Sequence, residues 1–182
     1  MNDFTAVSPG TPSTHADILY GPPRPDLLRE EVLADLLEAT ARRCPEQIAL
    51  IDGARRTTYA QLDAQAGLAA SRLVAAGVKP GDIVGLWLPR GAPLLLMQAA
   101  IAKAGAAWLP VDEDTPVERL QVCLDDANGA GVVSCAQFAP RLLDAGVQRP
   151  VWTAESLLTP AAPGELLPAR GTVLPEHPAY VI

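Results

Sequence analysis

Two short stretches of this sequence carry charged side chains that could bind a phosphate or a metal ion. The first is the PRGAP turn at residues 89–93, with one arginine and one glycine between an apolar run and a helical pattern. In an open parallel sheet, ligands bind at such strand-to-helix turns. However, the sequence contains neither GxGxxG nor GxxxxGK[ST], the glycine-rich loops that cradle phosphates. A structural turn is therefore favoured over a phosphate site.

The second stretch is a run of three carboxylates, Asp112, Glu113 and Asp114. Carboxylate oxygens are the ligands that a hard cation such as Mg²⁺ prefers. Acidic residues just before a helix are also stabilised by the helix dipole. Because no further ligands are spaced around this run, the dipole interpretation is favoured over a metal site.

The other charged candidates each have a simpler interpretation. Lys103 falls in the last turn of a predicted helix, where a cation suits the dipole. Arg55 and Arg56 are either a phosphate-binding pair or, as favoured here, the solvated arm of a hairpin. His15 lies alone in the N-terminal segment and is interpreted as a surface histidine, and His177 has no serine or cysteine nucleophile that the sequence pairs with it. The residues alone therefore predict no catalytic, cofactor-binding or metal-binding side chain in this chain.

Composition narrows the choice of partners and compartment. The chain has 182 residues, 49% of them hydrophobic, and a formal net charge of −7. That charge argues against nucleic acid or an anionic membrane as a partner, because both need clustered positive charge. The three cysteines, Cys44, Cys123 and Cys135, are odd in number and widely spaced, which is typical of reduced thiols. With no secretory signal pattern and no apolar run long enough to cross a bilayer, the sequence predicts a cytoplasmic protein.

The elements that must position these side chains alternate between strand and helix patterns. Residues 1–25 are predicted to be a flexible tail, rich in proline and serine, and residues 26–182 a domain. Helices are predicted at 31–43, 58–76, 93–103, 115–127 and 136–145, and strands at 48–51, 55–58, 83–88, 107–111, 131–134 and 151–152. Capping boxes at 58–61 and 115–118 support two of the helix starts. The alternation predicts an α/β fold with a mostly parallel sheet and flanking helices.

Two segments also resemble a known family. KAGAAWLPVD at 103–112, followed by TPVERL at 115–120, resembles the second core motif of the adenylation domains of nonribosomal peptide synthetases, within the adenylate-forming ligase superfamily. TTYAQL at 57–62 resembles the first core motif. The sequence departs from the usual pattern at Glu113, where the family has proline, and at Thr115, where it has tyrosine or histidine. Thr57 and Gln61 are milder departures in the first motif.

The resemblance implies a fold, a reaction and a set of partners. The fold is the first part of the N-terminal subdomain of an AMP-binding adenylation domain. In that family a serine-, threonine- and glycine-rich phosphate loop follows a segment like 179–182, so the domain at 26–182 is expected to be incomplete and this chain alone inactive. The intact enzyme is expected to use ATP and Mg to form an aminoacyl-AMP and to load the acyl group on the phosphopantetheine of a carrier domain. Its expected partners are the rest of its own domain and that carrier.

The segment at 24–36 is reminiscent of the polyamino-acid synthetases within this family. Two alternatives remain open. One is an acyl-CoA or acyl-carrier ligase of the same superfamily. The other is a stand-alone binding module without catalysis, although the apolar segment at 178–182 would leave such a module with an open strand edge.

Overall fold

The fold is built around one small parallel sheet with helices on both faces. The computed structural model describes residues 22, 24, 26, 29–160 and 168–182. Four strands form the sheet in the order β4-β3-β5-β6, and each neighbouring pair is parallel. The predicted α/β class with flanking helices is confirmed. Most of the predicted tail at 1–25, and residues 161–167 of the predicted domain, lie outside the described residues.

The helices and strands follow in strict alternation after a first helix and a hairpin. The helices are α1 (Leu33–Arg43), α2 (Tyr59–Ala75), α3 (Ala92–Lys103), α4 (Val117–Asp126), α5 (Ala139–Asp144) and α6 (Ala154–Leu157). The strands are β1 (Ile48–Asp52), β2 (Arg55–Thr58), β3 (Ile83–Trp87), β4 (Ala107–Val111), β5 (Gly131–Ser134) and β6 (Val151–Thr153).

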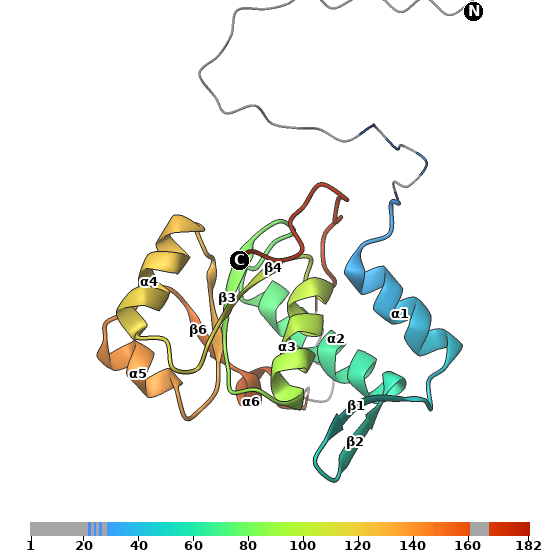
Figure 1. Ribbon diagram of the computed structural model, residues 1–182, viewed down its shortest axis with the longest axis horizontal. Helices are drawn as coiled ribbons and strands as arrows, with labels where there is room; N and C mark the ends of the chain where they lie inside the picture. The colour runs from blue at the N-terminus through green and yellow to red at the C-terminus, as the bar shows by residue number, and fades with distance from the viewer. Residues whose placement is uncertain (1–21, 23, 25, 27–28, 161–167) are drawn as a thin grey trace, which may run out of the picture.

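The crossover helices are divided between the two faces of the sheet. In Figure 1, α2 and α3 lie on one side, with α1 outside them, and α4 and α5 lie on the other. Every residue of β5 is buried, as expected of a central parallel strand covered on both faces. The core includes fully buried side chains from the sheet and from both helix layers, among them Leu86, Met97 and Leu120.

The β1–β2 hairpin forms a separate two-stranded antiparallel sheet. Its turn follows Asp52 and contains Gly53 at φ +56°, a conformation that glycine adopts without strain. The hairpin projects from the end of the molecule next to the start of α3 (Figure 1).

One of the two predicted capping boxes is confirmed and the other is wrong. At α2, Thr58 Oγ1 accepts from the Gln61 N–H at 3.2 Å, and Gln61 Oε1 accepts from the Thr58 N–H at 3.0 Å. At α4 the cap position is Pro116, with no side-chain hydrogen bond. The helix therefore begins one residue later than a box at Thr115 requires. This displaces Thr115 from the cap position and Glu118 from the third helical position.

This contrast predicts different costs for two threonine substitutions. Thr58→Ala is expected to lower the free energy of unfolding by about 1 kcal/mol, because an N–H of α2 loses its acceptor. Thr115→Ala is expected to change it by less than about 0.5 kcal/mol, as surface substitutions usually do. Urea titrations of both variants measure the difference; equal losses would contradict the assignment of the caps.

Near the C-terminal end of the described residues, the elements differ further from the sequence predictions. The helix predicted at 136–145 is shorter, because Pro140 is tolerated only in a first turn and α5 therefore begins at Ala139. The short helix α6 was missed; Thr153 caps it by accepting from the Ser156 N–H at 3.2 Å. The strand expected at 178–182 is a single parallel bridge between Tyr180 and Trp108.

Candidate functional site

The two charged stretches singled out from the sequence line the same cleft. It lies at the carboxyl edge of the sheet, between the turn after β3 and the turn after β4, and has a volume of about 770 Å³. Its lining includes Arg90 from the first turn, Leu94 from the start of α3, and residues 110–115 from the end of β4 and the turn after it. This is the position at which open α/β sheets bind ligands.

Trp87, the last residue of β3, organises this edge from within the core. Its side chain is fully buried, and its indole N–H donates to the Asp112 carbonyl oxygen at 3.0 Å. The Ser134 hydroxyl donates to the Trp87 carbonyl oxygen at 3.1 Å, which joins the ends of β5 and β3. The turn that carries the three carboxylates is therefore held by a buried tryptophan that the sequence analysis did not single out.

Trp87 is also the centre of an aromatic cluster. The Phe138 ring lies 4.9 Å from it, centroid to centroid, at an interplanar angle of 39°. The Arg141 guanidinium carbon lies 4.6 Å from the Trp87 ring centroid, within cation–π range. Two rings and one cation thus connect the end of β3 to α5.

The cleft has an excess of negative charge. Arg90 Nη2 lies 3.8 Å from Asp112 Oδ1, and both side chains are more than four-fifths exposed, so this ion pair contributes little. Asp112, Glu113 and Asp114 together outnumber the one arginine of the lining. No cluster of three or more potential metal ligands occurs within the described residues. Among the lining residues, Arg90 is the one cation that could face a phosphate, and cations or free N–H groups are what a phosphate needs.

A carboxylate of the protein already occupies the positive end of α3. Asp52 Oδ2, at the end of β1, accepts from the Ala92 N–H at 3.1 Å. The preceding Gly91 has φ +151°, and a Cβ there would lie 3.3 Å from the same oxygen. The first N–H of α3 is therefore bonded within the chain, to the end of β1. Asp52 itself was recognised only as a turn residue, because its partner is distant in the sequence.

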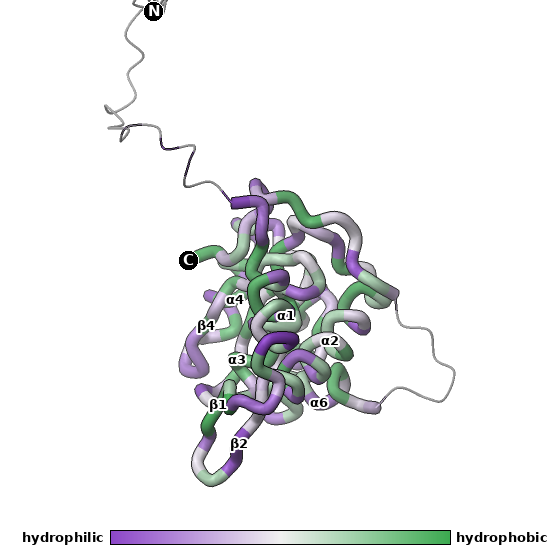
Figure 2. Tube along the Cα trace, turned by 90° about the vertical axis from the view of Figure 1, so that its right-hand side faces the viewer, coloured by the Kyte–Doolittle hydropathy of each residue, from purple (hydrophilic) through white to green (hydrophobic). Residues whose placement is uncertain are grey.

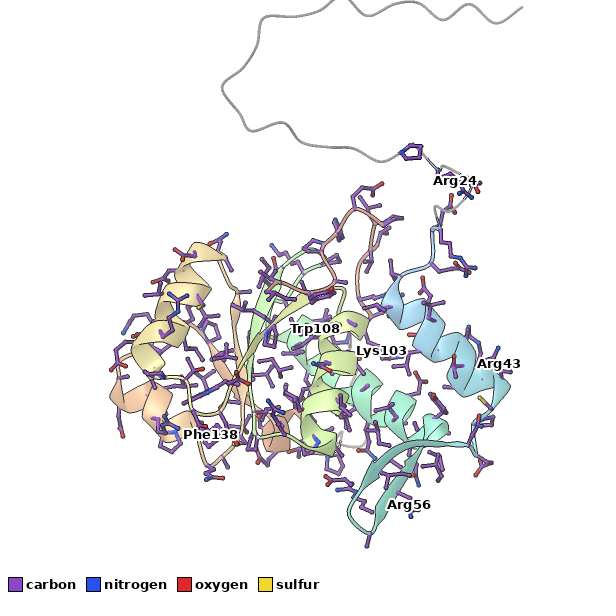
Figure 3. The ribbon with its side chains drawn as sticks, viewed as in Figure 1. Arg24, Arg43, Arg56, Lys103, Trp108 and Phe138 are labelled. Carbon is purple, nitrogen blue, oxygen red and sulfur yellow. The ribbon has the colours of Figure 1, made fainter. Side chains whose placement is uncertain are left out.

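Lys103 lies at the other end of α3, away from the cleft. Its ammonium nitrogen donates to Glu38 Oε1 of α1 at 2.7 Å and to Asp63 Oδ1 of α2 at 2.8 Å. Only 10% of its side chain is exposed. Figure 3 shows Lys103 on the side of α3 that faces α1. Lys103 therefore links α1, α2 and α3 through two ion pairs.

We expect a moderate loss of stability when the charge of Lys103 is removed, because both of its ion pairs are lost. Lys103→Met keeps most of the side-chain volume but leaves two carboxylates facing each other. Breaking a buried pair costs more than removing both partners, and here Glu38 and Asp63 are about one-third exposed, so we expect a loss of about 2 kcal/mol. Adding Glu38→Gln and Asp63→Asn to the variant should recover part of this loss in urea titrations. No recovery would show that the charges are not coupled.

The remaining candidates lie apart from one another. Arg55 and Arg56 are exposed on the hairpin. His177 Nδ1 accepts from the Leu174 N–H at 3.3 Å, which stabilises a local turn. Trp108 of β4 is half-buried and stacks on Tyr180 with ring centroids 5.7 Å apart. His15 lies outside the described residues.

The segment at 179–181 runs beside β4 at the edge of the sheet. The Val181 N–H donates to the Trp108 carbonyl oxygen at 3.0 Å. The Trp108 N–H donates to the Ala179 carbonyl oxygen at 3.4 Å. The bridge is parallel, so this segment points towards the same carboxyl edge as β4. It therefore points towards the edge that carries the acidic cleft.

Known proteins with similar sequences and structures point to one family. Residues 37–182 match the family described as AMP-binding enzyme. Delta-poly-L-ornithine synthetase of Acinetobacter baumannii is 43% identical over 91% of this chain, and enterobactin synthase component F of Escherichia coli is 35% identical over 84%. The solved structure of the nonribosomal peptide synthetase FmoA3, in its alpha-methyl-L-serine-AMP-bound form, covers 85% of this chain with a TM-score of 0.74 and 29% identity.

The chain spans only a small part of each of these relatives. It covers 12% of the ornithine synthetase, 11% of the enterobactin synthase component and 17% of the FmoA3 chain. None of the helices in the described part of the chain has the length and apolar character that crossing a bilayer requires.

Proposed function

Because this chain belongs to the AMP-binding enzyme family, we propose that it is the N-terminal scaffold of an enzyme that activates an amino acid with ATP. The family match over residues 37–182 is the observation that carries the proposal. The intact enzyme would form an aminoacyl-AMP and pass the acyl group to the phosphopantetheine thiol of a carrier domain. Its cofactors would be ATP and Mg, and the partners of this segment would be the rest of its adenylation domain and the carrier.

In this proposal, residues 26–182 belong to the N-terminal subdomain and residues 1–25 precede it. No residue of the chain is assigned a catalytic, cofactor-binding or metal-binding role. The acidic lining of the cleft and the use of the α3 N-terminus by Asp52 support this, because neither offers a site for a polyphosphate.

The chain's own contribution would be to position a nucleotide-binding loop supplied by other residues. The bridge between Tyr180 and Trp108 supports this role, since the parallel segment at 179–181 points towards the carboxyl edge. The buried Trp87 would keep the neighbouring turn at 112–115 fixed through its bond to the Asp112 carbonyl oxygen. Preorganisation of this kind is what charge stabilisation at a reacting phosphorus requires.

The experiment is amino-acid-dependent exchange of labelled pyrophosphate into ATP by the intact gene product. The panel would contain the proteinogenic amino acids together with ornithine, which is chosen because of the name of the ornithine synthetase relative. Exchange with one or a few amino acids supports the proposal. Exchange only with fatty or aryl carboxylic acids would favour the acyl ligase alternative, and no exchange with either set would favour a non-catalytic module.

A further inference from the structure

The segment at 168–181 has no regular secondary structure of its own to hold it in place. It contains no helix, and it pairs with the sheet only through the single bridge between Tyr180 and Trp108. In Figure 1 it is drawn in red and passes between the start of α1 and β4. Its course therefore depends on the side-chain contacts that it makes along the way.

The middle of the segment lies on the two turns that lead into β3 and β4. A Cβ on Gly105 would lie 2.8 Å from Val173 Cγ2, and one on Gly81 would lie 3.4 Å from His177 Cδ2. The Gly81 N–H donates to the Gly105 carbonyl oxygen at 2.9 Å, so the two turns are joined to each other. The segment thus crosses the amino edge of the sheet before residues 179–181 run alongside β4.

One ion pair joins the start of this segment to α1. Arg170 Nη2 donates to Asp35 Oδ1 at 2.7 Å, across 135 residues of sequence, and the two side chains are 24% and 44% exposed. Asp35 Oδ2 accepts from the Val32 N–H at 3.2 Å, so the same carboxylate also binds the residue before α1. This N–H bond, with a smaller contribution from Arg170, lowers the pKa of the Asp35 carboxyl and keeps it charged at neutral pH.

Apart from this pair, the start of α1 packs loosely. The two buried residues of α1 are both alanines, whereas Leu33 and Leu36 are 45% and 46% exposed. A cavity of about 230 Å³ lies between the first turn of α1 and residues 173–179. Figure 2, in which α1 faces the viewer, shows it as the outer helix of this layer. Among the described residues, Asp35 and Arg170 form the one ion pair between α1 and the segment.

We propose that Asp35 and Arg170 are positioning residues for the amino-acid activation proposed above. Their ion pair ties the segment at 168–181 to α1 and so keeps residues 179–181 in register beside β4. The inference rests on the proposed function, in which this segment helps to position a nucleotide-binding loop. Neither residue lines the cleft at the carboxyl edge, and Arg170 lines a cavity beside Lys103, at the other end of α3. The pair therefore acts on the reaction only through the segment.

The first test measures amide hydrogen exchange in the chain of residues 1–182. Asp35→Asn keeps an acceptor for the Val32 N–H but removes the charge that binds Arg170. Because a partly exposed ion pair has a modest effect, we expect the Val181 amide, which donates to β4, to exchange about fivefold faster. Arg170→Gln should have the same effect. The double variant should exchange no faster than either single variant, because both substitutions remove the same interaction.

Asp125→Asn is the matched control, since it breaks the 3.0 Å ion pair between Asp125 and Arg149 on the α4 side of the sheet. It should leave the Val181 amide unchanged. Arg170→Lys, which keeps the charge, should keep most of the protection. Unchanged amide exchange in β5 would show that each variant keeps its fold. An unaffected Val181 amide in D35N, or additive effects in the double variant, would overturn the anchoring role.

The second test measures pyrophosphate exchange by the intact gene product with the same substitutions. We expect D35N and R170Q to lower kcat about fivefold and to leave KM for the amino acid within about twofold of the parent, because the segment positions the nucleotide loop. R170K and D125N should both keep kcat. Faster exchange of the Val181 amide with an unchanged kcat would overturn the positioning role. A parent enzyme without any pyrophosphate exchange would refute the proposed function itself, whereas the Val181 amide would still show whether the pair anchors the segment.

Discussion

Replacing Trp87 by alanine is expected to lower the free energy of unfolding by about 4 kcal/mol, because large-to-small changes of buried aromatics cost this much. The side chain is fully buried, and its ring contacts Phe138 and Arg141. The substitution also leaves the Asp112 carbonyl oxygen without its indole donor. Urea or thermal unfolding of the variant measures the loss.

Trp87→Phe separates the packing contribution from the hydrogen bond. Phenylalanine keeps an aromatic ring at the end of β3 but has no N–H, so we expect a smaller loss of about 1–2 kcal/mol. In the phenylalanine variant, amides of residues 112–115 should exchange faster with solvent, whereas those of β5 should not. Equal stability losses in the two variants would contradict the packing role assigned to the indole.

Replacing Gly131 by alanine is expected to cost about 3 kcal/mol, because overpacking a dense core is destabilising. A Cβ at this position would lie 2.5 Å from two carbons of the Trp152 ring and 2.8 Å from the Pro150 carbonyl oxygen. The two ring carbons are at the far end of the partly buried Trp152 side chain, which can shift, whereas the Pro150 carbonyl oxygen is part of the backbone. Gly131 is therefore required by space rather than by backbone conformation.

Gly67→Ala is the matched control, and it should raise the free energy of unfolding rather than lower it. Gly67 lies within α2, and a Cβ there would lie 3.6 Å from Lys103 Cε, an ordinary contact. Alanine in a helix interior is favoured over glycine by about 1 kcal/mol, so this variant should be more stable than the parent. Adding Trp152→Leu to the Gly131 variant should recover only part of the loss, since the clash with Pro150 remains. Full recovery would show that the ring alone sets the cost.

The sequence predicted the helices and strands well where neighbouring residues, such as turn residues and caps, marked both the type and the ends of an element. The bounds predicted for β2, β4 and β5 agree with the structure, because each strand is an apolar or polar run between clear turn residues. The Thr58 cap was predicted because both partners lie within one turn. At α4 the same pattern gave a wrong prediction: the N-cap residue is Pro116, whereas the capping box required Thr115 at that position.

The site could be predicted only in part, because its contacts join residues distant in the sequence. The turns at 89–93 and 112–115 were singled out by their charges, and the parallel sheet brings them to one edge. The bonds that fix them, from Trp87 to Asp112 and from Asp52 to Ala92, span 25 and 40 residues and leave no periodic signal. The same holds for Lys103, whose two acidic partners come from different helices.

Exchange of pyrophosphate into ATP by residues 1–182 alone tests the central claim most directly. The chain is proposed to provide a scaffold, with an acidic cleft and a self-capped helix in place of a nucleotide site. We therefore predict no amino-acid-dependent exchange above background by this chain, under conditions in which the intact gene product is active. Robust exchange by the isolated chain, with any amino acid and Mg-ATP, would contradict the account.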